Sequence, residues 1–408
     1  MTVLLDDAHV ARPPAARALP TGFVATTARP RLDSIDLLRG LIMVVMALDH
    51  TRDFFGASGM NPRDVTDPAL FMTRWVTHFC APLFIFLSGI SAWLYGSRGR
   101  TAGELSRFLL TRGLWLMLIE LTVVRFGWTF SFVIDVFVIQ VIFAIGASMV
   151  VLAGLIHLPR WVVAAIALTM LVGHNLLDGV RPEQFGALGW LWSVLHQRGF
   201  ALGSSDEGVF VLYPLVPWIG VMAAGYVLGP LLKNDAEVRR RWLIGLGVSV
   251  IVGFVLIRAT NLYGDPAPWT PQESALATVL SFVNCEKYPP SLLYLMMTLG
   301  PALLLLALFE RVHGRFADVI ATFGRVPFFY YIVHLYLIHV LALVAAWWSM
   351  GDMGWLLSGH LPNKPASYGY GLAGIYAVWL LVVVALYPAC RWFASVKQRN
   401  RSWWLSYL

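Results

Sequence analysis

Two histidines, His50 and His78, stand at the ends of apolar stretches and are the strongest candidates for proton-transfer chemistry. Neutral imidazole takes a proton from an amine or an alcohol near neutral pH, and this step activates such a nucleophile for attack on an acyl group. A carboxylate that binds the second ring nitrogen fixes the tautomer of the base. Asp53 lies about one helical turn beyond His50, so the sequence predicts Asp53 in this role.

His50 shares a helical face with two other charged residues. At about 100° per residue, Asp36, Arg39 and His50 fall on one stripe of the segment 34–55, and apolar side chains cover most of the rest. This stripe is expected to face protein or water instead of lipid. Asp36 and Arg39 are also spaced for an i, i+3 ion pair near the helix start. Gly40 lacks a side chain, which lets a neighbouring helix or a ligand approach closely.

Further ionisable residues fall within or beside apolar stretches. Such residues are costly in hydrocarbon and mark functional sites by default. With Asp36, those assigned here to a cavity or acceptor site are Asp49, Glu120, Arg125, Asp135, His334 and His339. These residues lie on several segments, and lipid cannot solvate their side chains. We therefore predict that they converge in a polar cavity that opens to the outer face. His334 and His339 are about 140° apart on a helix, so only one of the two is expected to line it.

The composition places these residues in a membrane protein. Of the 408 residues, 58% are hydrophobic and 13% are charged, and the mean hydropathy is +0.69. A membrane span needs about twenty mainly apolar residues, and backbone groups in hydrocarbon must be satisfied within the segment, which favours helices. The sequence therefore predicts an all-α polytopic bundle of about ten helices. The apolar windows lie at 34–55, 75–96, 107–127, 131–156, 160–178, 208–232, 240–260, 290–310, 326–348 and 370–394.

Basic residues predict the orientation of this bundle. Lys and Arg gather after the second, sixth and eighth windows and at the C-terminus, and short cytoplasmic loops are enriched in them. Both termini are therefore expected in the cytoplasm. Residues 1–33 read as a mobile cytoplasmic tail, 34–396 as the membrane domain and 397–408 as a basic tail. The net charge of +7 reflects this bias rather than nucleic-acid binding.

The cysteines and the long loops add little chemistry. The three cysteines lie in unrelated segments without metal-binding spacing, so neither a disulfide framework nor a zinc site is expected. Residues 264–290 are rich in turn-forming residues and predict a long outer loop over the acceptor side. Glu286 in this loop is either an acceptor contact or a solvated carboxylate.

The motifs resemble a known family. The pattern Asp36-x-x-Arg39-Gly40, with His50 eleven residues after the arginine, is similar to the first-helix signature of the transmembrane acyltransferase superfamily. Three stretches together resemble the bacterial branch of the heparan-alpha-glucosaminide N-acetyltransferase catalytic-domain family: "RLDSIDLLRGLIMVVMALDHTRDFF", "THFCAPLFIFLSGISAWLYG" and "FGRVPFFYYIVHLYLIH". The resemblance spans residues 31 to about 345.

The resemblance implies an acetyltransferase of a bacterial inner membrane. In this family cytoplasmic acetyl-CoA, as co-substrate, donates an acetyl group to a sugar amine or hydroxyl on the far side. The animal enzyme has an asparagine at the place of His50 and its catalytic histidine in the following outer loop. The loop 56–74 of this chain has no histidine. The base is therefore expected to be His50 or His78, with Arg125 or the second histidine as a donor to the oxyanion.

The spacing of Arg39 and His50 suggests which residues bind CoA. Arg39 and His50 are separated by a helical rise of roughly 16 Å, which is comparable with an extended pantetheine arm. We therefore expect Arg39, with Gly40, Arg98 and Arg112, to bind the CoA phosphates. For Arg98 and Arg112, the enrichment of basic residues in cytoplasmic loops is the competing explanation.

Two other functions remain open from the sequence. In a proton-coupled transporter, His50, His78, Glu120 and Asp135 would form a proton relay. Such transporters are often built from two related halves, and no matching pair of elements is visible here. A membrane scaffold ranks last, because it leaves the ionisable residues unexplained. Membrane lipid is an expected partner and nucleic acid is not, and lipid-facing and subunit-facing surfaces look alike in a sequence, so a homo-oligomer stays open.

Overall fold

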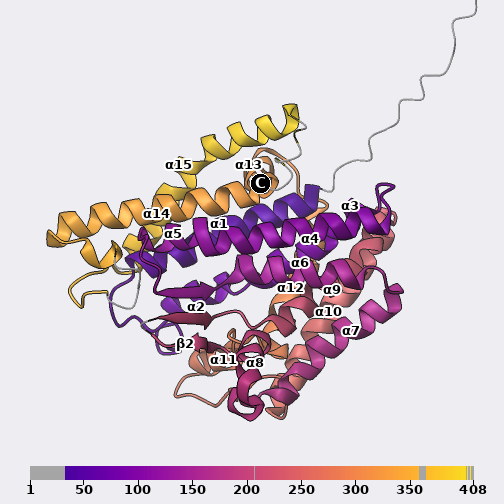
Figure 1. Ribbon diagram of the computed structural model, residues 1–408, viewed down its shortest axis with the longest axis horizontal. Helices are drawn as coiled ribbons and strands as arrows, with labels where there is room; N and C mark the ends of the chain where they lie inside the picture. Colours follow the sequence, from indigo (N-terminus) through magenta and orange to yellow (C-terminus); the bar gives the residue numbers. More distant parts are fainter. Residues whose placement is uncertain (1–32, 206, 358–363, 401, 403–404, 406–408) are drawn as a thin grey trace, which may run out of the picture. The chain divides into compact units, whose positions relative to one another are not determined.

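The computed structural model describes residues 33–205, 207–357, 364–400, 402 and 405, and every structural statement below concerns these residues. Helices form most of the described chain (Figure 1). The α-helices are α1 (Asp33–Phe55), α2 (Pro68–Thr77), α3 (Cys80–Gly96), α4 (Ala102–Ile119), α5 (Arg125–Thr129), α6 (Val141–Leu155), α7 (Arg160–Gly173), α8 (Gly189–Leu195), α9 (Leu215–Leu228), α10 (Ala236–Thr260), α11 (Ala275–Val283), α12 (Leu292–Phe309), α13 (Arg315–Arg325), α14 (Pro327–Met350) and α15 (Leu372–Arg399). A π-helical turn (Glu120–Val124) joins α4 to α5, and 3₁₀ segments cover His174–Leu177, Pro182–Leu188, Gly229–Lys233 and Gly354–Leu357.

The helices confirm the predicted all-α polytopic membrane bundle. Seven helical segments among the described residues are long and apolar enough to cross a membrane: Pro68–Gly96, Arg160–Leu177, Leu215–Lys233, Ala236–Thr260, Leu292–Phe309, Pro327–Met350 and Leu372–Arg399. Helices α1, α4 and α6 occupy the three remaining windows. The count of about ten spans and the cytoplasmic termini stay predictions. The expected tail at 1–33 lies outside the described residues except for Asp33, which begins α1, and α15 extends to Arg399 in the expected basic tail.

Pairs of glycines lie where helices approach closely, and in three of the four pairs each glycine faces backbone atoms of the partner helix. In each pair, a Cβ added to one glycine would fall closer to the partner helix than real Cβ atoms pack, and the reverse substitution meets the same obstacle. Small residues at such crossings let membrane helices approach closely. The pairs are Gly40 and Gly324 (α1 with α13), Gly89 and Gly225 (α3 with α9), Gly113 and Gly146 (α4 with α6), and Gly247 and Gly300 (α10 with α12).

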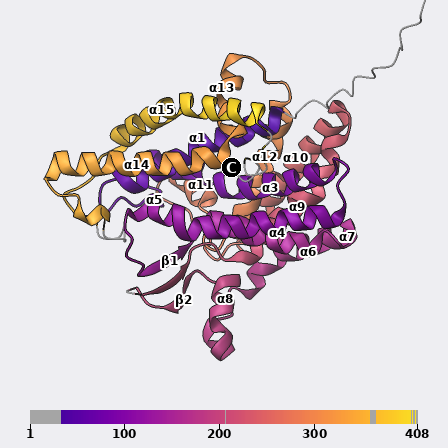
Figure 2. The same ribbon diagram turned by 45° about the horizontal axis from the view of Figure 1, so that its top comes forward.

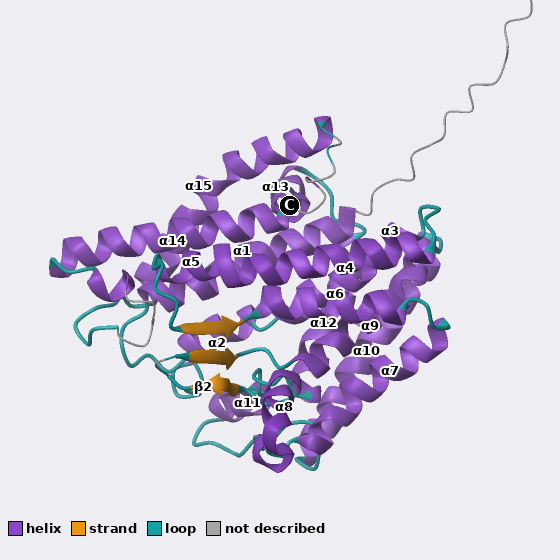
Figure 3. Cartoon of the chain, viewed as in Figure 1, coloured by secondary structure: helices purple, strands orange, loops and turns teal. Residues whose placement is uncertain are grey.

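A small sheet corrects two of the predicted windows. Strands β1 (Val136–Ile139), β2 (Gly199–Gly203) and β3 (Gly208–Val211) form a sheet in the order β1-β3-β2, with β1 parallel and β2 antiparallel to β3 (Figure 3). The windows 131–156 and 208–232 were therefore too long at their N-terminal ends, where a strand precedes the helix. Hydropathy does not separate an apolar β-branched strand from the helix that follows it.

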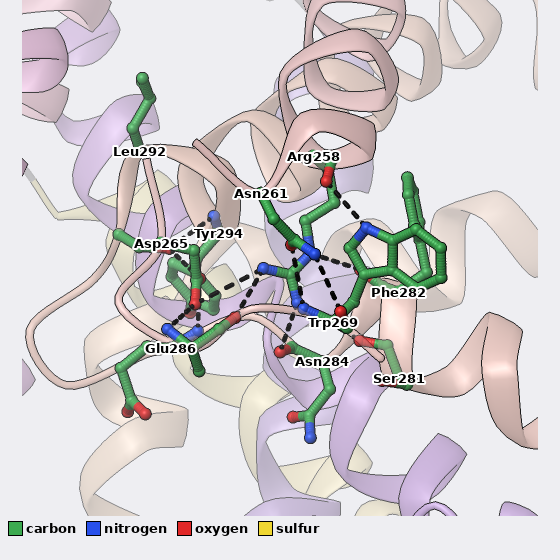
Figure 4. Close-up of polar contacts among 12 residues, drawn as sticks. Arg258, Asn261, Asp265, Trp269, Ser281, Phe282, Asn284, Glu286, Leu292 and Tyr294 are labelled. Atoms are coloured by element: carbon green, nitrogen blue, oxygen red, sulfur yellow. Dashed lines mark hydrogen bonds and ion pairs between the residues drawn. The ribbon is translucent and has the colours of Figure 1, made fainter. Parts of the chain in front are cut away.

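The outer loop is the second correction, because 264–290 is not all irregular. It contains α11, whose N-cap Ser274 accepts a hydrogen bond from the backbone of Ala277. Arg258, 1% exposed in the last turn of α10, holds the loop in place (Figure 4). Its guanidinium donates to four loop carbonyls at 2.8–3.3 Å, those of Ala267, Ser281, Phe282 and Asn284. This anchoring positions the segment 286–290, which borders the candidate site.

Helix α1 carries the residues of greatest chemical interest. Its N-terminal half packs on α13 through Gly40, and α14 runs alongside it in both views of the ribbon (Figures 1 and 2). Trp379 of α15 donates its indole N–H to the carbonyl of Val44 at 2.8 Å. Contacts with α13, α14 and α15 therefore fix the position of α1, whose C-terminal turns are polar.

Candidate active site

His50 lies in the C-terminal part of α1 within an aromatic cage. The centroid of its ring is 4.9 Å from that of Trp128, 5.0 Å from that of His334 and 6.1 Å from that of Tyr331. Phe54, one turn further along α1, stacks on Trp128 at 5.3 Å. Helices α1, α5 and α14 thus each contribute a ring, and His50 itself stays partly exposed.

The hydrogen bonds define which nitrogen of His50 carries the proton. His334 Nδ1 lies 2.9 Å from the carbonyl oxygen of Tyr330, so it must be protonated to donate. In neutral His334, Nε2 is then an acceptor, and it lies 2.9 Å from Nδ1 of His50. His50 therefore donates through Nδ1 and keeps a lone pair on Nε2. Among the described residues none binds this Nε2, so it is available as a base.

The position expected for Asp53 is therefore occupied by His334. The Asp53 carboxylate lies 3.1 Å from Arg52 instead. Arg52 also binds Asp49 at 2.6 Å, and Asp49 accepts a hydrogen bond from Thr77 at 3.0 Å. Lys287 of the outer loop approaches Asp49 at 3.8 Å. Thr77 and Lys287 come from other segments, so Asp49, the neighbour of His50 in the chain, has contacts outside α1 as well as with Arg52.

His78 lies in a different environment. It occupies the break between α2 and α3, is 1% exposed, and contacts the ring of Tyr294 at 5.4 Å. Its backbone carbonyl accepts a hydrogen bond from the Tyr294 hydroxyl at 2.7 Å. The ring contacts of His50 are with other residues, so His50 and His78 do not form a pair.

The residues expected to bind CoA make contacts within the protein. Arg39 donates to Ser91 Oγ at 2.9 Å, lies 3.4 Å from Asp36 and reaches the carbonyl of Gly324 at 3.4 Å. The alternative i, i+3 pair is thus present. Gly40 faces the backbone of α13, so a helix makes the close approach there. Arg112 lies 5.9 Å from the ring of Phe108, and Arg98 is exposed in the turn after α3.

The remaining ionisable residues do not all converge on one cavity. Glu120 accepts hydrogen bonds from the backbone of Ile142 and Phe143 at 3.0 and 3.2 Å, so it caps the N-terminus of α6. Arg125 pairs with Asp135 at 3.6 Å, and Asp135 lies before β1 and not in a helix as expected. His339 lies between the carbonyls of Gly127 and Leu356 at 2.9 and 3.1 Å, on a different face of α14 from His334.

Trp128 is the functional candidate that sequence reasoning missed. Its side chain is 9% exposed, and its indole N–H has no hydrogen-bond partner within the described part of the chain. A buried donor without a partner is costly, and such groups call for an explanation. Trp128 is one of 17 tryptophans, and no sequence signal distinguishes it. A donor beside the candidate base is suited to bind an oxygen that gains negative charge.

Comparison with known proteins identifies the family. Residues 31–258 match the protein-family model described as "Heparan-alpha-glucosaminide N-acetyltransferase, catalytic". The match covers more than half of the chain, includes His50, His78 and Trp128, and confirms the predicted family. No curated protein sequence matches this chain.

Proposed function

The chain belongs to the heparan-alpha-glucosaminide N-acetyltransferase catalytic-domain family, and we propose that it transfers an acetyl group from cytoplasmic acetyl-CoA to an amine or hydroxyl of a sugar-like acceptor outside the membrane. The family supports an acetyltransferase, and the helices support an integral membrane protein. The bacterial inner membrane is the proposed location. The observation that carries the proposal is the hydrogen bond between His50 and His334, which leaves His50 Nε2 as a base.

The proposed reaction balances through His50. Nε2 takes the proton of the acceptor N–H or O–H as that nitrogen or oxygen forms a bond to the thioester carbonyl carbon. The carbon–sulfur bond then breaks, and the CoA thiolate takes the proton from the imidazolium. His334 holds the ring through Nδ1 during both proton transfers. No metal is needed in these steps.

Trp128 has a separate role in this proposal. The thioester carbonyl becomes an oxyanion when the nucleophile attacks, and a preorganised donor stabilises that charge. The free indole N–H of Trp128, on a ring 4.9 Å from that of His50, is the donor we assign. Arg39 already contacts Asp36 and Ser91. We therefore assign binding of the CoA phosphates to the exposed Arg98 in preference to Arg39.

The first experiment measures transfer from radiolabelled acetyl-CoA to a panel of amino sugars, with purified protein in nanodiscs. His50→Ala removes the base and is expected to abolish labelling while acetyl-CoA binding is retained. His157→Ala, a histidine exposed in the turn between α6 and α7, is the matched control and is expected to keep wild-type activity. Full activity in His50→Ala would refute the assignment of the base, and absence of acetyl-CoA binding and turnover in the wild type would refute the function.

The role of His334 gives a second measurement. In His334→Leu, His50 loses the acceptor that fixes its tautomer, so kcat is expected to fall by about 10²-fold or more. The KM values for acetyl-CoA and for the acceptor are expected to change little, because the proposed role of His334 is to orient His50 and not to bind either substrate. An unchanged kcat would show that the tautomer is set by another group. A rise in KM alone would indicate a packing role.

A further inference from the structure

An apolar groove lies between α7, α9 and α10, which all belong to segments long and apolar enough to cross a membrane. The groove has a volume of about 370 Å³, and all ten residues that line it are apolar. Helix α7, at the edge of the bundle, packs on α9, whereas the main partner of α10 is α12 (Figure 1). The groove is therefore the gap that α7 and α10 leave over α9.

Small side chains make this groove hollow, and larger ones form its rims. Ala164 lines it from α7 and Ala224 lines it from α9, and both stay partly exposed. At the rims, Leu168 of α7 is 62% exposed and Trp242 of α10 is 58% exposed. Because these helices belong to a membrane bundle, the groove opens to hydrocarbon. An empty gap there would forfeit dispersion contacts, and a flexible acyl chain fits its shape.

An arginine is aligned with one end of the groove. Gly220 in the first half of α9 faces Met170 in the last turn of α7. Tyr226 in the last turn of α9 lies near Arg160, the first residue of α7. The two helices are therefore antiparallel, and Arg160 lies where α9 ends. Because Arg160 precedes Ala164 by four residues, both side chains are on the face of α7 that lines the groove.

The charges at this end of the groove favour an anion. Arg160 is exposed, and its side chain forms no hydrogen bond or salt bridge with any other described residue. Leu231 and Trp242 line the groove on either side of the segment 233–241, which contains four basic and two acidic residues. Basic residues near a membrane surface attract anionic lipids. Trp161 and Trp242, each directly after an arginine, are exposed, which is typical of the headgroup level.

We propose that the groove binds one acyl chain of an anionic phospholipid from the leaflet at this end, which is expected to be the cytoplasmic one. The acyl chain lies over α9 between Ala164 and Trp242, and Arg160 donates charge-assisted hydrogen bonds to the phosphate. The net positive charge of the segment 233–241 favours an anionic headgroup over a zwitterionic one. This lipid site does not depend on the proposed acetyl transfer.

The test measures lipid binding to the full-length protein by native mass spectrometry. The protein in detergent is titrated with phosphatidylglycerol or with phosphatidylcholine that has the same acyl chains. The first phosphatidylglycerol is expected to bind at least about fivefold more tightly than the first phosphatidylcholine, because of the basic residues at the headgroup. Equal affinities would overturn the proposal. A lipid-free dimer that dissociates in Ala164→Phe would show that a second copy covers the groove, and would also overturn it.

Two pairs of variants locate the two parts of the lipid. Arg160→Gln is expected to weaken phosphatidylglycerol about fivefold and to lower its preference over phosphatidylcholine. Arg315→Gln, an exposed arginine on α13 outside the groove, is the control. Ala164→Phe fills the groove and is expected to weaken both lipids by about tenfold. Ala165→Phe adds the same bulk at an exposed position outside the groove and is expected to change neither.

These variants also define the results that contradict the proposal. Unchanged binding in Ala164→Phe would show that the acyl chain lies elsewhere, and unchanged binding in Arg160→Gln would show that the phosphate does. Either result overturns the site. Thermal unfolding of the four variants checks that they are folded, and the exposed position of Arg160 keeps its variant informative if Ala164→Phe is unstable.

Discussion

In the proposed mechanism, a neutral histidine, His334, sets the tautomer of His50. In many hydrolases a carboxylate fixes the tautomer of the catalytic histidine. Here the same task falls to His334, which is itself fixed by the carbonyl of Tyr330. The carboxylate of Asp49 is held by Arg52 and Thr77. In the proposed mechanism, a neutral histidine thus has the position that an aspartate often occupies, and Asp49 is paired with cations instead.

The indole N–H of Trp128 can be tested with a substitution that keeps most of the ring packing. In Trp128→Phe, an aromatic ring still fills the space between His50 and Phe54, but the donor is lost. We expect kcat for acetyl transfer to fall by about 10²–10³-fold, as for the loss of other oxyanion donors. Steady-state kinetics measure the effect, and Trp161→Phe, an exposed tryptophan on α7, is the control. A KM effect without a kcat effect would contradict the role.

At the residue level, the contacts of His50 differ from those predicted, and its role as the base stays a prediction. His50 was predicted from its type and place, and His334 was among the cavity candidates. Asp53 was placed on His50 because residues three apart are neighbours on a helix, yet Arg52 competes for that carboxylate. Lys287 and Trp128 come from distant segments. Their approach to α1 depends on how the helices cross, which spacing along one segment does not determine.

At the scale of elements, the glycine pairs determine how closely the helices that carry the site approach. A side chain at Gly40 would overlap the carbonyl of Ile320, and one at Gly324 would overlap that of Asp36. A carbonyl group of a helix backbone, unlike the end of a side chain, cannot rotate away from an added methyl group. The distance between α1 and α13 therefore has almost no tolerance, and α1 is the helix that bears His50.

The Gly40 contact predicts a loss of stability. Gly40→Ala must push α1 from α13, so we expect a destabilisation of about 1–3 kcal/mol. Gly245→Ala in α10 is the matched control, because its added Cβ meets nothing within 4 Å. There we expect no loss, or a gain of up to about 1 kcal/mol from the better helix former. Thermal denaturation in detergent measures both, and equal effects would show that the crossing is adaptable.

The Arg258 anchor predicts a local effect on the outer loop. Arg258→Met leaves four loop carbonyls without their donor and removes the cation 3.7 Å from Asp265. We expect amide hydrogen exchange over 261–291 to accelerate, since breaking a buried ion pair costs about 3–5 kcal/mol. Arg241→Met on the same helix, an exposed position, is the control. Unchanged exchange in the loop would mean that Asp265 and Trp269 hold it without the arginine.

The sequence predicted which segments are apolar and where most helices lie, and it failed where elements change type. Strands β1 and β3 are short, apolar and directly upstream of helices, so hydropathy merged them with α6 and α9. Helix α11 was hidden among turn-forming residues. Its Ser274 cap is visible in the sequence, but a nine-residue helix carries too weak a periodic signal to stand out.

At the scale of the whole molecule, the orientation in the membrane decides which substrate each end can meet. Lys287 of the outer loop contacts Asp49, the neighbour of His50 in the chain. Arg98 lies after α3, in the group of basic residues expected at the cytoplasmic face. Acetyl-CoA is made in the cytoplasm, so the proposed reaction requires these two ends to face opposite compartments. In this orientation each substrate reaches the bundle from its own side of the membrane, and neither substrate has to cross it.

This orientation can be tested by labelling single cysteines. Cys80, Cys285 and Cys390 are all buried, so the background is low. In intact cells, Glu273→Cys in the outer loop is expected to react with a membrane-impermeant maleimide, and Arg98→Cys is expected to react only after the membrane is opened. The reverse pattern would place the termini outside. Labelling of both positions in intact cells would contradict a bundle that spans the membrane between them.

The reciprocal glycines also set a rule for protein engineering. In three of the four pairs each glycine faces the backbone of the other helix, so no second substitution at the partner position can restore a side chain at the first. Six positions therefore have to be kept fixed in a designed library: 40, 89, 113, 146, 225 and 324. The exposed apolar positions of α7, α10 and α15, such as Leu168, Val252 and Val384, can be varied freely among apolar residues. A library built on this rule should yield more thermostable variants than one that randomises the apolar positions without distinction.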